Sequence, residues 1–300
     1  MRMRAVLFMG LLMRCVFEVA MAHAIAGMRV FPGTLTFADP GVTDELDLTY
    51  AGAALADTPG GSSPHTSTFA LSDSKTITRR LGLSVGTAYQ NTAGPGSPRG
   101  IENLNLGIDY LLLKSDRQET LLTGALNESL GNTGGAGVGT TYSVFSPTLL
   151  FGRGFGDLPG SLRDLRPLAI TGILAPNIPS TASVPKSLTW GISVQYSLPY
   201  LQSYVHDVGL HAPFNNIVPL VELPMQTYTS GPYAGQTIGT INPGFVWIGR
   251  YGQMGLEATI PVNRASGHGL GVVFGVGFYF DDIYPHSLGT PLFPTTPKTL

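Results

Sequence analysis

Apolar and polar residues alternate along much of the chain. In the clearest run, small or polar residues separate the large side chains of Leu188, Trp190, Ile192, Val194, Tyr196 and Leu198. A period of two places successive side chains on opposite faces of a β-strand. This segment is therefore predicted to be a strand with one apolar face and one small, polar face.

The same alternation recurs between turn signals rich in Gly, Pro and Ser. Eleven strands are predicted near residues 66–78, 81–91, 101–113, 118–130, 140–152, 166–176, 187–198, 217–227, 237–250, 253–262 and 269–280. A weaker twelfth candidate spans residues 44–54. Alternation over about 9–11 residues suits a tilted strand that crosses lipid, whereas strands of soluble proteins are typically about 5–6 residues long.

The polar faces of these strands carry Gly, Ser, Thr and Asn with few charges. A soluble barrel would turn its apolar faces inward and place charges on the outside, so these faces fit a lumen better than bulk water. We therefore predict an all-β fold, a transmembrane antiparallel up-and-down β-barrel of about 12 strands (range about 10–14), because bacterial barrels use even strand numbers. Small inner residues favour open space in the lumen and weakly favour a channel.

Connections on alternate sides of such a barrel should differ in length. The turns near residues 79–80, 115–117 and 251–252 are short, as expected on the periplasmic side. Two further periplasmic connections, 153–165 and 199–216, are long. They either contain small helices or mark an error in the strand register.

Composition supports a membrane barrel over other classes. Charged residues make up only 12% of the 300 residues, hydrophobic residues make up 43%, and no apolar stretch is long enough for a membrane-spanning helix. The formal charge of −2 offers no electrostatic footprint for nucleic acid. The single cysteine, Cys15, lies near the N-terminus.

The N-terminus has the pattern of a secretory signal peptide. A basic start precedes the apolar stretch Ala5–Met13, and Ala22-His23-Ala24 forms an A-x-A cleavage site, with Ala24-Ile25-Ala26 as a second candidate. We expect a signal peptide at residues 1–24 and a single barrel domain at 25–300. Removal of the signal peptide changes the net charge of the chain from −2 to −4 and leaves no thiol. The expected location is the outer membrane of a Gram-negative bacterium, with lipid and the export and barrel-assembly machinery as partners.

Motifs for catalysis, metals or cofactors are not evident, and we predict none of these. The glycine-rich segment Gly131–Gly139 lacks the lysine of a phosphate-binding loop and is predicted to be an extracellular loop. His206 and His211 are five residues apart, which is not the spacing of a zinc-binding helix. No G-x-S-x-G motif accompanies the inward serines, so the chain is not expected to be an enzyme.

The inner faces supply the candidate pore-lining residues. They are Asn103, Asn105, Asp109, Ser193, Gln195, Glu222, Thr240, Asn242, Arg250 and Glu257. Because Glu222, Arg250 and Glu257 come from three consecutive strands, we hypothesise that they form a lumen cluster. It would act either as a structural ion-pair network or as a mildly cation-preferring pore lining, since rings of carboxylates favour cations.

Several segments resemble a known family. These are FGRGFGDLPGSL (151–162), LTWGISVQYSLPYL (188–201), the segment 240–267 and FYFDDIYPHSLGTPLF (278–293). Together they resemble the bacterial outer-membrane β-barrels labelled after a meta-pathway of phenol degradation, whose members are often called transporters. The resemblance covers roughly residues 34–293. It implies a membrane location and a link to the uptake of aromatic compounds, and it assigns no functional residue.

These observations predict a passive pore or uptake channel for small solutes, with aromatic or apolar solutes suggested by the resemblance. The alternatives are an outer-membrane enzyme and a barrel that does not conduct. The chain departs from known barrels at its C-terminal end. Known barrels usually end with the last strand, whereas here the predicted last strand ends near Phe280 and about 20 residues follow it. Either the assembly signal is internal or this tail adds a further element.

The signal-peptide interpretation predicts cleavage after Ala24, or after Ala26 at the second site. N-terminal sequencing of the protein extracted from membranes measures this directly. Mature protein that still begins at Met1 would contradict it.

Overall fold

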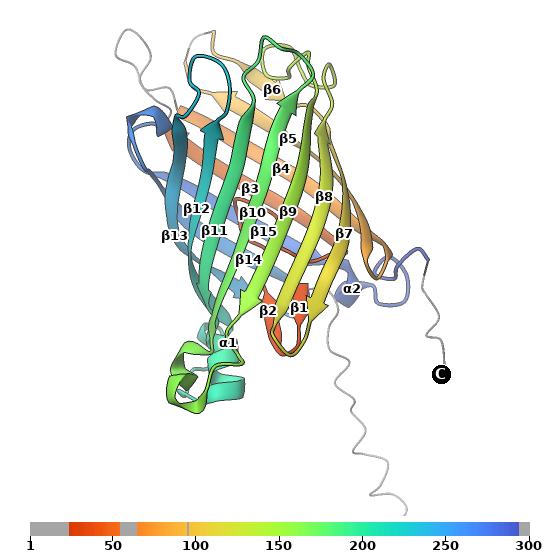
Figure 1. Ribbon diagram of the computed structural model, residues 1–300, viewed down its shortest axis with the longest axis vertical. Coiled ribbons are helices and arrows are strands. Elements are labelled where there is room, and N and C mark those ends of the chain that lie inside the picture. Colours follow the sequence, from red (N-terminus) through yellow and green to blue (C-terminus); the bar gives the residue numbers. More distant parts are fainter. Residues whose placement is uncertain (1–23, 55–64, 95, 294–300) are drawn as a thin grey trace, which may run out of the picture.

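Twelve strands form a barrel in the computed structural model, which describes residues 24–54, 65–94 and 96–293 (Figure 1). They are β3 (Glu45–Ala54), β4 (His65–Thr78), β5 (Leu81–Thr92), β7 (Asn105–Ser115), β8 (Thr120–Ser129), β9 (Val144–Gly154), β10 (Leu168–Pro179), β11 (Ser187–Tyr196), β12 (Ile217–Tyr228), β13 (Thr237–Ile248), β14 (Gly252–Pro261) and β15 (Gly271–Tyr279). A short strand, β6 (Arg99–Ile101), adds to β5 at one end.

The sheet closes on itself without a free edge. Each strand pairs antiparallel with its neighbour along the chain, β15 pairs with β3, and β4 pairs with both β3 and β5. The predicted all-β barrel of about 12 strands is therefore confirmed. All twelve strands overlap the ranges expected from sequence, including the weaker candidate at residues 44–54.

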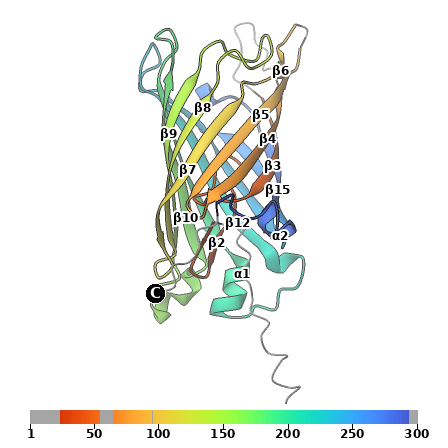
Figure 2. The ribbon, with the colours of Figure 1, turned by 90° about the vertical axis from the view of Figure 1, so that its right-hand side faces the viewer.

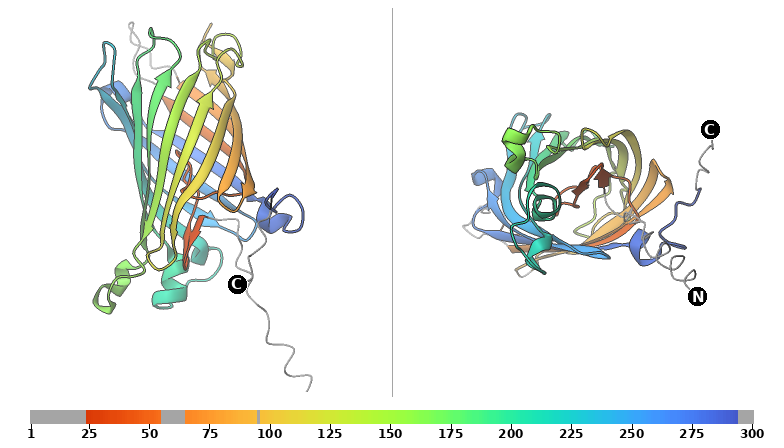
Figure 3. Two further views of the ribbon diagram at one scale, coloured as in Figure 1. Left: turned by 45° about the vertical axis from the view of Figure 1, so that its right-hand side comes forward. Right: turned by 90° about the horizontal axis from the view of Figure 1, so that it is seen from below.

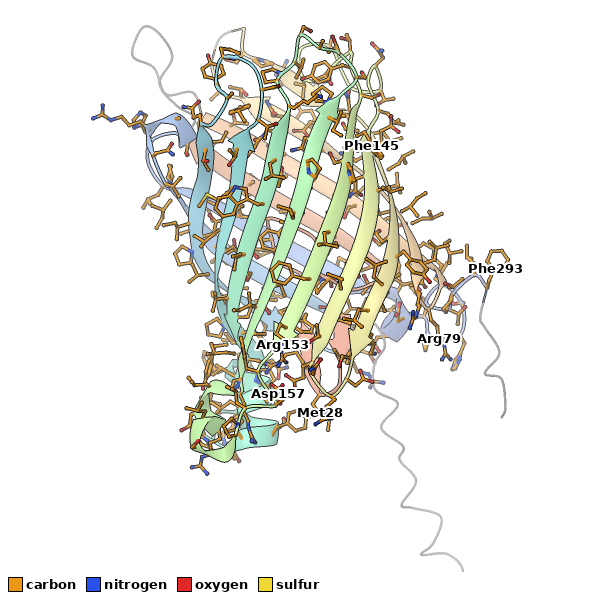
Figure 4. All side chains as sticks on the ribbon, in the orientation of Figure 1. Met28, Arg79, Phe145, Arg153, Asp157 and Phe293 are labelled. Atoms are coloured by element: carbon orange, nitrogen blue, oxygen red, sulfur yellow. The ribbon has the colours of Figure 1, made fainter. Side chains whose placement is uncertain are left out.

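The alternation of residues becomes an alternation of environments. In β14, Gln253 and Glu257 are buried inside the barrel, whereas Met254 and Leu256, 46% and 42% exposed, lie on its outer surface. Large apolar side chains cover the outer wall, as at Phe145 in Figure 4. A closed sheet with an apolar outer face is the structure that crosses lipid with strands, and the molecule is an outer-membrane β-barrel.

The two ends of the barrel are built differently. The end that holds both described termini has the short turns of the β4–β5, β7–β8 and β13–β14 hairpins, which identifies it as periplasmic (Figures 1 and 2). The two long connections at this end contain short helices, namely η1 (Gly160–Leu165), α1 (Leu198–Tyr200), η2 (Leu201–Val205) and η3 (Phe214–Asn216). A further turn of helix, η4 (Arg264–Ser266), lies in a connection at the opposite end. In the described part of the chain, no helix is long and apolar enough to cross a membrane.

The residues after β15 return to the barrel. A short helix, α2 (Phe280–Ile283), follows β15, and the backbone N–H groups of Leu292 and Phe293 then donate to the carbonyls of Thr76 and Ile77 at the end of β4. Lys75 Nζ donates to the carbonyls of Leu288 and Thr290, at 2.6 and 2.9 Å. The tail thus adds a further element to the barrel end, which was one of the two outcomes expected from sequence.

The start of the described chain lies inside the barrel. Strands β1 (Ala24–Ala26) and β2 (Arg29–Phe31) form a hairpin within the ring of strands at the periplasmic end (Figure 3, right). Residues 1–23 of the predicted leader (1–24) lie outside the described residues, and its last residue, Ala24, is the first of β1. Cleavage after Ala26 would remove β1, whereas cleavage after Ala24 would leave most of the hairpin.

Two adjacent residues of β4 test the orientation of the wall. Leu71 is 45% exposed on the outer surface, whereas Ser72, the next residue of β4, is less exposed and by strand alternation is directed to the lumen side. We expect Leu71→Arg to destabilise the folded barrel in lipid by about 2–4 kcal/mol, because it places a charge against lipid tails. Ser72→Arg should cost much less. Refolding titrations into lipid vesicles measure both values, and equal costs or the reverse order would reject this register.

Candidate functional site in the barrel lumen

The lumen is occupied by the segment that precedes the first barrel strand. Residues 24–44, here called the plug, form the β1–β2 hairpin and then run along the inside of the wall to β3. Phe31 is fully buried and Phe37 is 9% exposed, so the plug carries apolar side chains into the barrel. Residues 153–165 and 199–216 lie below it at the periplasmic end (Figure 2).

Glycines on the inner wall make room for this segment. A Cβ atom at Gly275 would lie 2.6 Å from Leu35, and one at Gly152 would lie 2.8 Å from Pro40 and 3.1 Å from Phe31. Such distances are below van der Waals contact. The space that small inner residues were expected to leave for a channel is therefore taken up, in part, by the plug.

A buried ion pair holds the plug at the periplasmic end. Arg29 Nε lies 3.2 Å from Glu119 Oε2, and both side chains are almost completely buried. The Arg29 guanidinium also donates to the carbonyls of Arg166 and Pro167, the latter at 2.9 Å. Its carbon lies 3.9 Å from the centre of the Tyr200 ring, which adds a cation–π contact.

Glu119 is positioned by three separate segments, namely the plug and the two long periplasmic connections. Besides Arg29, it accepts from the Tyr200 hydroxyl at 2.8 Å and from the Gly156 backbone N–H at 3.1 Å. Burial, followed by the hydrogen bond to Glu119, raises the pKa of Tyr200 to about 12. Tyr200 is therefore protonated at neutral pH and keeps donating to Glu119. Because removal of one partner leaves a buried charge uncompensated, this cluster is costly to break.

Weaker contacts fasten the plug along its length. The Gly27 backbone N–H donates to Asp116 at 2.9 Å, and Thr123 donates to the Pro40 carbonyl at 2.7 Å. The amide of Gln253 donates to the Gly33 carbonyl at 3.2 Å, and the Thr36 hydroxyl donates to Glu222. These partners lie on β8, β12 and β14 and in the β7–β8 turn, so the plug is attached to more than one side of the wall.

Five of the ten candidate pore-lining residues are packed inside the barrel. Their exposures are 0–2%, and they are Ser193, Gln195, Glu222, Asn242 and Glu257. Glu222 pairs with Asn242 across β12 and β13, and Gly244, two residues further along β13, pairs with Glu257 of β14. The structure thus brings the two carboxylates together, one of them bonded to the plug.

Arg250 is not part of this group. Strand β13 ends at Ile248, and Arg250 lies exposed in the turn before β14, with its guanidinium 5.1 Å from the centre of the Tyr251 ring. The hypothesis of a Glu222–Arg250–Glu257 cluster was therefore wrong for Arg250. Among the described residues neither glutamate forms an ion pair.

The four remaining candidates lie in different places. Asn103 is bonded to the glycine-rich extracellular loop, since its amide donates to Thr140 and accepts from the Gly134 backbone N–H. Asn105 and Asp109 line one cavity of about 510 Å³. Thr240 lines a second cavity of about 600 Å³, with Trp190 and Met225 in its wall. Both cavities contact plug residues Thr36 and Phe37.

Other polar groups that could carry chemistry lie at the ends of the barrel and form no metal site among the described residues. His206 Nδ1 lies 3.6 Å from Asp164 Oδ1 at the periplasmic end. Asp281 and Asp282, which belong to the last segment of the family resemblance, lie in the short helix after the last strand. Within the described ranges, no group of three or more His, Cys, Asp or Glu residues is arranged to hold a metal ion.

Sequence reasoning did not identify the plug or its attachment. The larger part of the plug, VFPGTLTFADPGV at residues 30–42, shows neither helical nor strand periodicity. Glu119 and Tyr200 lie in connections between strands, far from Arg29 in the chain. The available signal was indirect: apolar residues such as Phe31 and Phe37 follow the predicted cleavage site, but they do not alternate with polar residues over the length of a wall strand.

Comparisons with known proteins found matches among solved structures alone. No family model and no curated protein matches the chain. Among solved structures, the KdgM porin is 12% identical with a TM-score of 0.48, and the match covers 79% of this chain and 99% of that one. The NanC porin is 8% identical with a TM-score of 0.47, covering 78% and 98%. An outer membrane channel from Pseudomonas putida F1 is 12% identical with a TM-score of 0.48, covering 84% and 100%.

Proposed function

We propose that this protein is a passive outer-membrane channel for small solutes and that its N-terminal plug is the gate. The observation that carries the proposal is the position of residues 24–44, which enter the lumen from the periplasmic end and are fastened there by Arg29. A barrel whose lumen is closed by a separate segment can open when that segment moves, without any change in the wall.

The contacts of the plug suit a gate. Its main anchor is one ion pair at the periplasmic end, with single hydrogen bonds further along. Cavities of about 510 and 600 Å³ already lie beside it in the lumen. Displacement of the plug would join this space into a longer path. Loss of the Arg29–Glu119 contact is the step that should control opening.

A second candidate is a barrel that does not conduct. The same plug favours it, because Phe31 and Phe37 fill space that a solute would need. The enzymatic alternative has less support, since the inward Ser193 is bonded by Gln195 and, within the described residues, it donates to no histidine that could act as its base. The expected roles of the signal peptide and the assembly machinery remain predictions, as does the aromatic or apolar class of solute.

Replacement of Arg29 by alanine tests the gate. We expect Arg29→Ala to increase open-channel events in planar bilayers by about tenfold or more, because stripping one partner from a buried pair costs about 3–5 kcal/mol. Single-channel recordings of the purified, refolded protein measure this. Arg163→Ala is the matched control, since Arg163 lies in the same periplasmic region with its side chain 62% exposed.

The result distinguishes the two candidate functions. A wild type with rare openings and an Arg29→Ala variant with frequent openings would support the gate. If a correctly folded Arg29→Ala variant is as silent as the wild type, the barrel does not conduct through this lumen and the second candidate stands. An equal effect of Arg163→Ala would show that the anchor has no special role.

The lumen carboxylates give a prediction on selectivity. In a chain that carries Arg29→Ala, we expect a preference for cations over anions, because Glu222 and Glu257 have no basic partner among the described residues. Reversal potentials in a salt gradient measure this preference, and Glu222→Gln with Glu257→Gln should reduce it. If the Glu222→Gln, Glu257→Gln variant conducts with unchanged selectivity, these two carboxylates do not determine the cation preference of the pore.

A further inference from the structure

One lumen cavity is lined by acidic side chains. It has a volume of about 510 Å³ and lies between the plug and the inner wall, with residues of β3, β4, β5, β7, β14 and β15 in its lining. Five carboxyl groups line it, and no Lys, Arg or His does: Asp39, Glu45, Asp47, Glu102 and Asp109. Within the described residues, none of the five forms an ion pair.

Two buried or half-buried basic side chains at this end of the barrel, Arg29 and Lys75, have other partners. Arg29 is bound to Glu119 and two carbonyls. Lys75 donates to Asp44 at 2.8 Å and to two carbonyls of the tail. The hydrogen-bonding groups of Arg29 and Lys75 are therefore engaged elsewhere, and no basic side chain of the described residues lines the acidic cavity. Such charge must be neutralised by water, protons or a ligand.

A buried amide at the same cavity supplies a second, independent observation. Gln253 lines the cavity and is only 7% exposed. Its Nε2 atom donates to the Gly33 carbonyl of the plug, but its Oε1 atom has no hydrogen-bond partner. A buried amide oxygen without a donor is unfavourable by itself. A ligand that carries N–H groups would satisfy this oxygen and the neighbouring carboxylates together.

The arrangement of the carboxylates indicates the shape of the ligand. Asp39 comes from the plug, Glu45 and Asp47 come from β3, and Asp109 comes from β7. Glu102 comes from the connection after β6. The acids are thus spread around the wall of a cavity large enough for a small organic molecule. Inward hydroxyl groups, including those of Thr49 and Ser84, offer further hydrogen-bond partners.

We propose that this cavity is a binding site for small organic cations that carry ammonium groups, with a flexible diamine as the simplest ligand. Each ammonium group donates three hydrogen bonds, which suits carboxylates together with the oxygen of Gln253. Binding requires no conduction. As a statement about the solute that crosses the membrane, however, the inference rests on the proposed channel function.

Isothermal titration calorimetry on the full mature chain in detergent tests binding alone. The probes are 1,4-diaminobutane, butane-1,4-diol and succinate, which share a four-carbon skeleton and differ in charge. Ca²⁺ alone is a fourth probe. We expect measurable heat for the diamine, weaker binding as salt increases, and no binding of the diol or succinate.

The variant Asp47→Asn with Asp109→Asn removes two charges at nearly constant volume. We expect it to weaken diamine binding by about tenfold or more, since a hydrogen bond to a charged group is worth at least that factor. Glu128→Gln is the matched control, because Glu128 is exposed on β8 outside the cavity. Asp39 is kept, since it accepts from the Gly41 backbone N–H at 2.9 Å and shapes the plug.

Each outcome decides the proposal. Diamine binding that the double variant loses and Glu128→Gln retains would support it. Three outcomes would overturn it: no diamine binding to the wild type, equal binding of the diol, or an unaffected double variant. Heat from Ca²⁺ and from no other probe would also overturn it, because the site would then bind a metal ion. Far-ultraviolet circular dichroism checks that each variant is folded. If the diamine binds but no variant conducts, the site stands and the channel function fails.

Discussion

A strand that crosses lipid has no water to satisfy its backbone, and this constraint underlies the whole structure. Each unpaired N–H or C=O group in the hydrocarbon region costs several kcal/mol, so the sheet must close. Closure depends on the pairing of β15 with β3, which joins the last strand of the wall to the first. The tail then packs alongside the end of β4, where Lys75 binds both Asp44 and tail carbonyls. The joint between the two ends of the chain is thereby reinforced.

Closure creates a second environment with different rules. The inner wall is shielded from lipid but is also largely shielded from bulk water, so every polar group there needs a partner. Backbone and side chains of the plug satisfy several of them, as where Thr36 meets Glu222 and Pro40 meets Thr123. The inward glycines have the complementary role, because Leu35 and Phe31 could not approach the wall if Gly275 and Gly152 carried side chains.

The lumen is nevertheless not neutral. Carboxylates line it on two sides of the plug, at Glu222 and Glu257 and around the cavity beside Asp47 and Asp109. The basic residues Arg29 and Lys75 are engaged at the periplasmic end. This separation links the proposed gate to the proposed ligand, since the plug that closes the lumen also supplies Asp39 to the acidic cavity. Movement of the plug would change the passage and the binding site together.

The sequence by itself determined the wall of this protein. Period-two alternation is a local property of each strand, and it was sufficient to locate the twelve strands and the apolar outer face, because lipid selects the same pattern in each of them. The contents of the lumen depended on the tertiary structure alone. Arg29 meets Glu119 and Tyr200 across more than 80 residues of chain, and Arg250 leaves the predicted cluster because β13 ends two residues before it. Such contacts arise only when the sheet closes, since closure brings distant turns to one end of the barrel and encloses a segment whose own sequence has no periodic pattern.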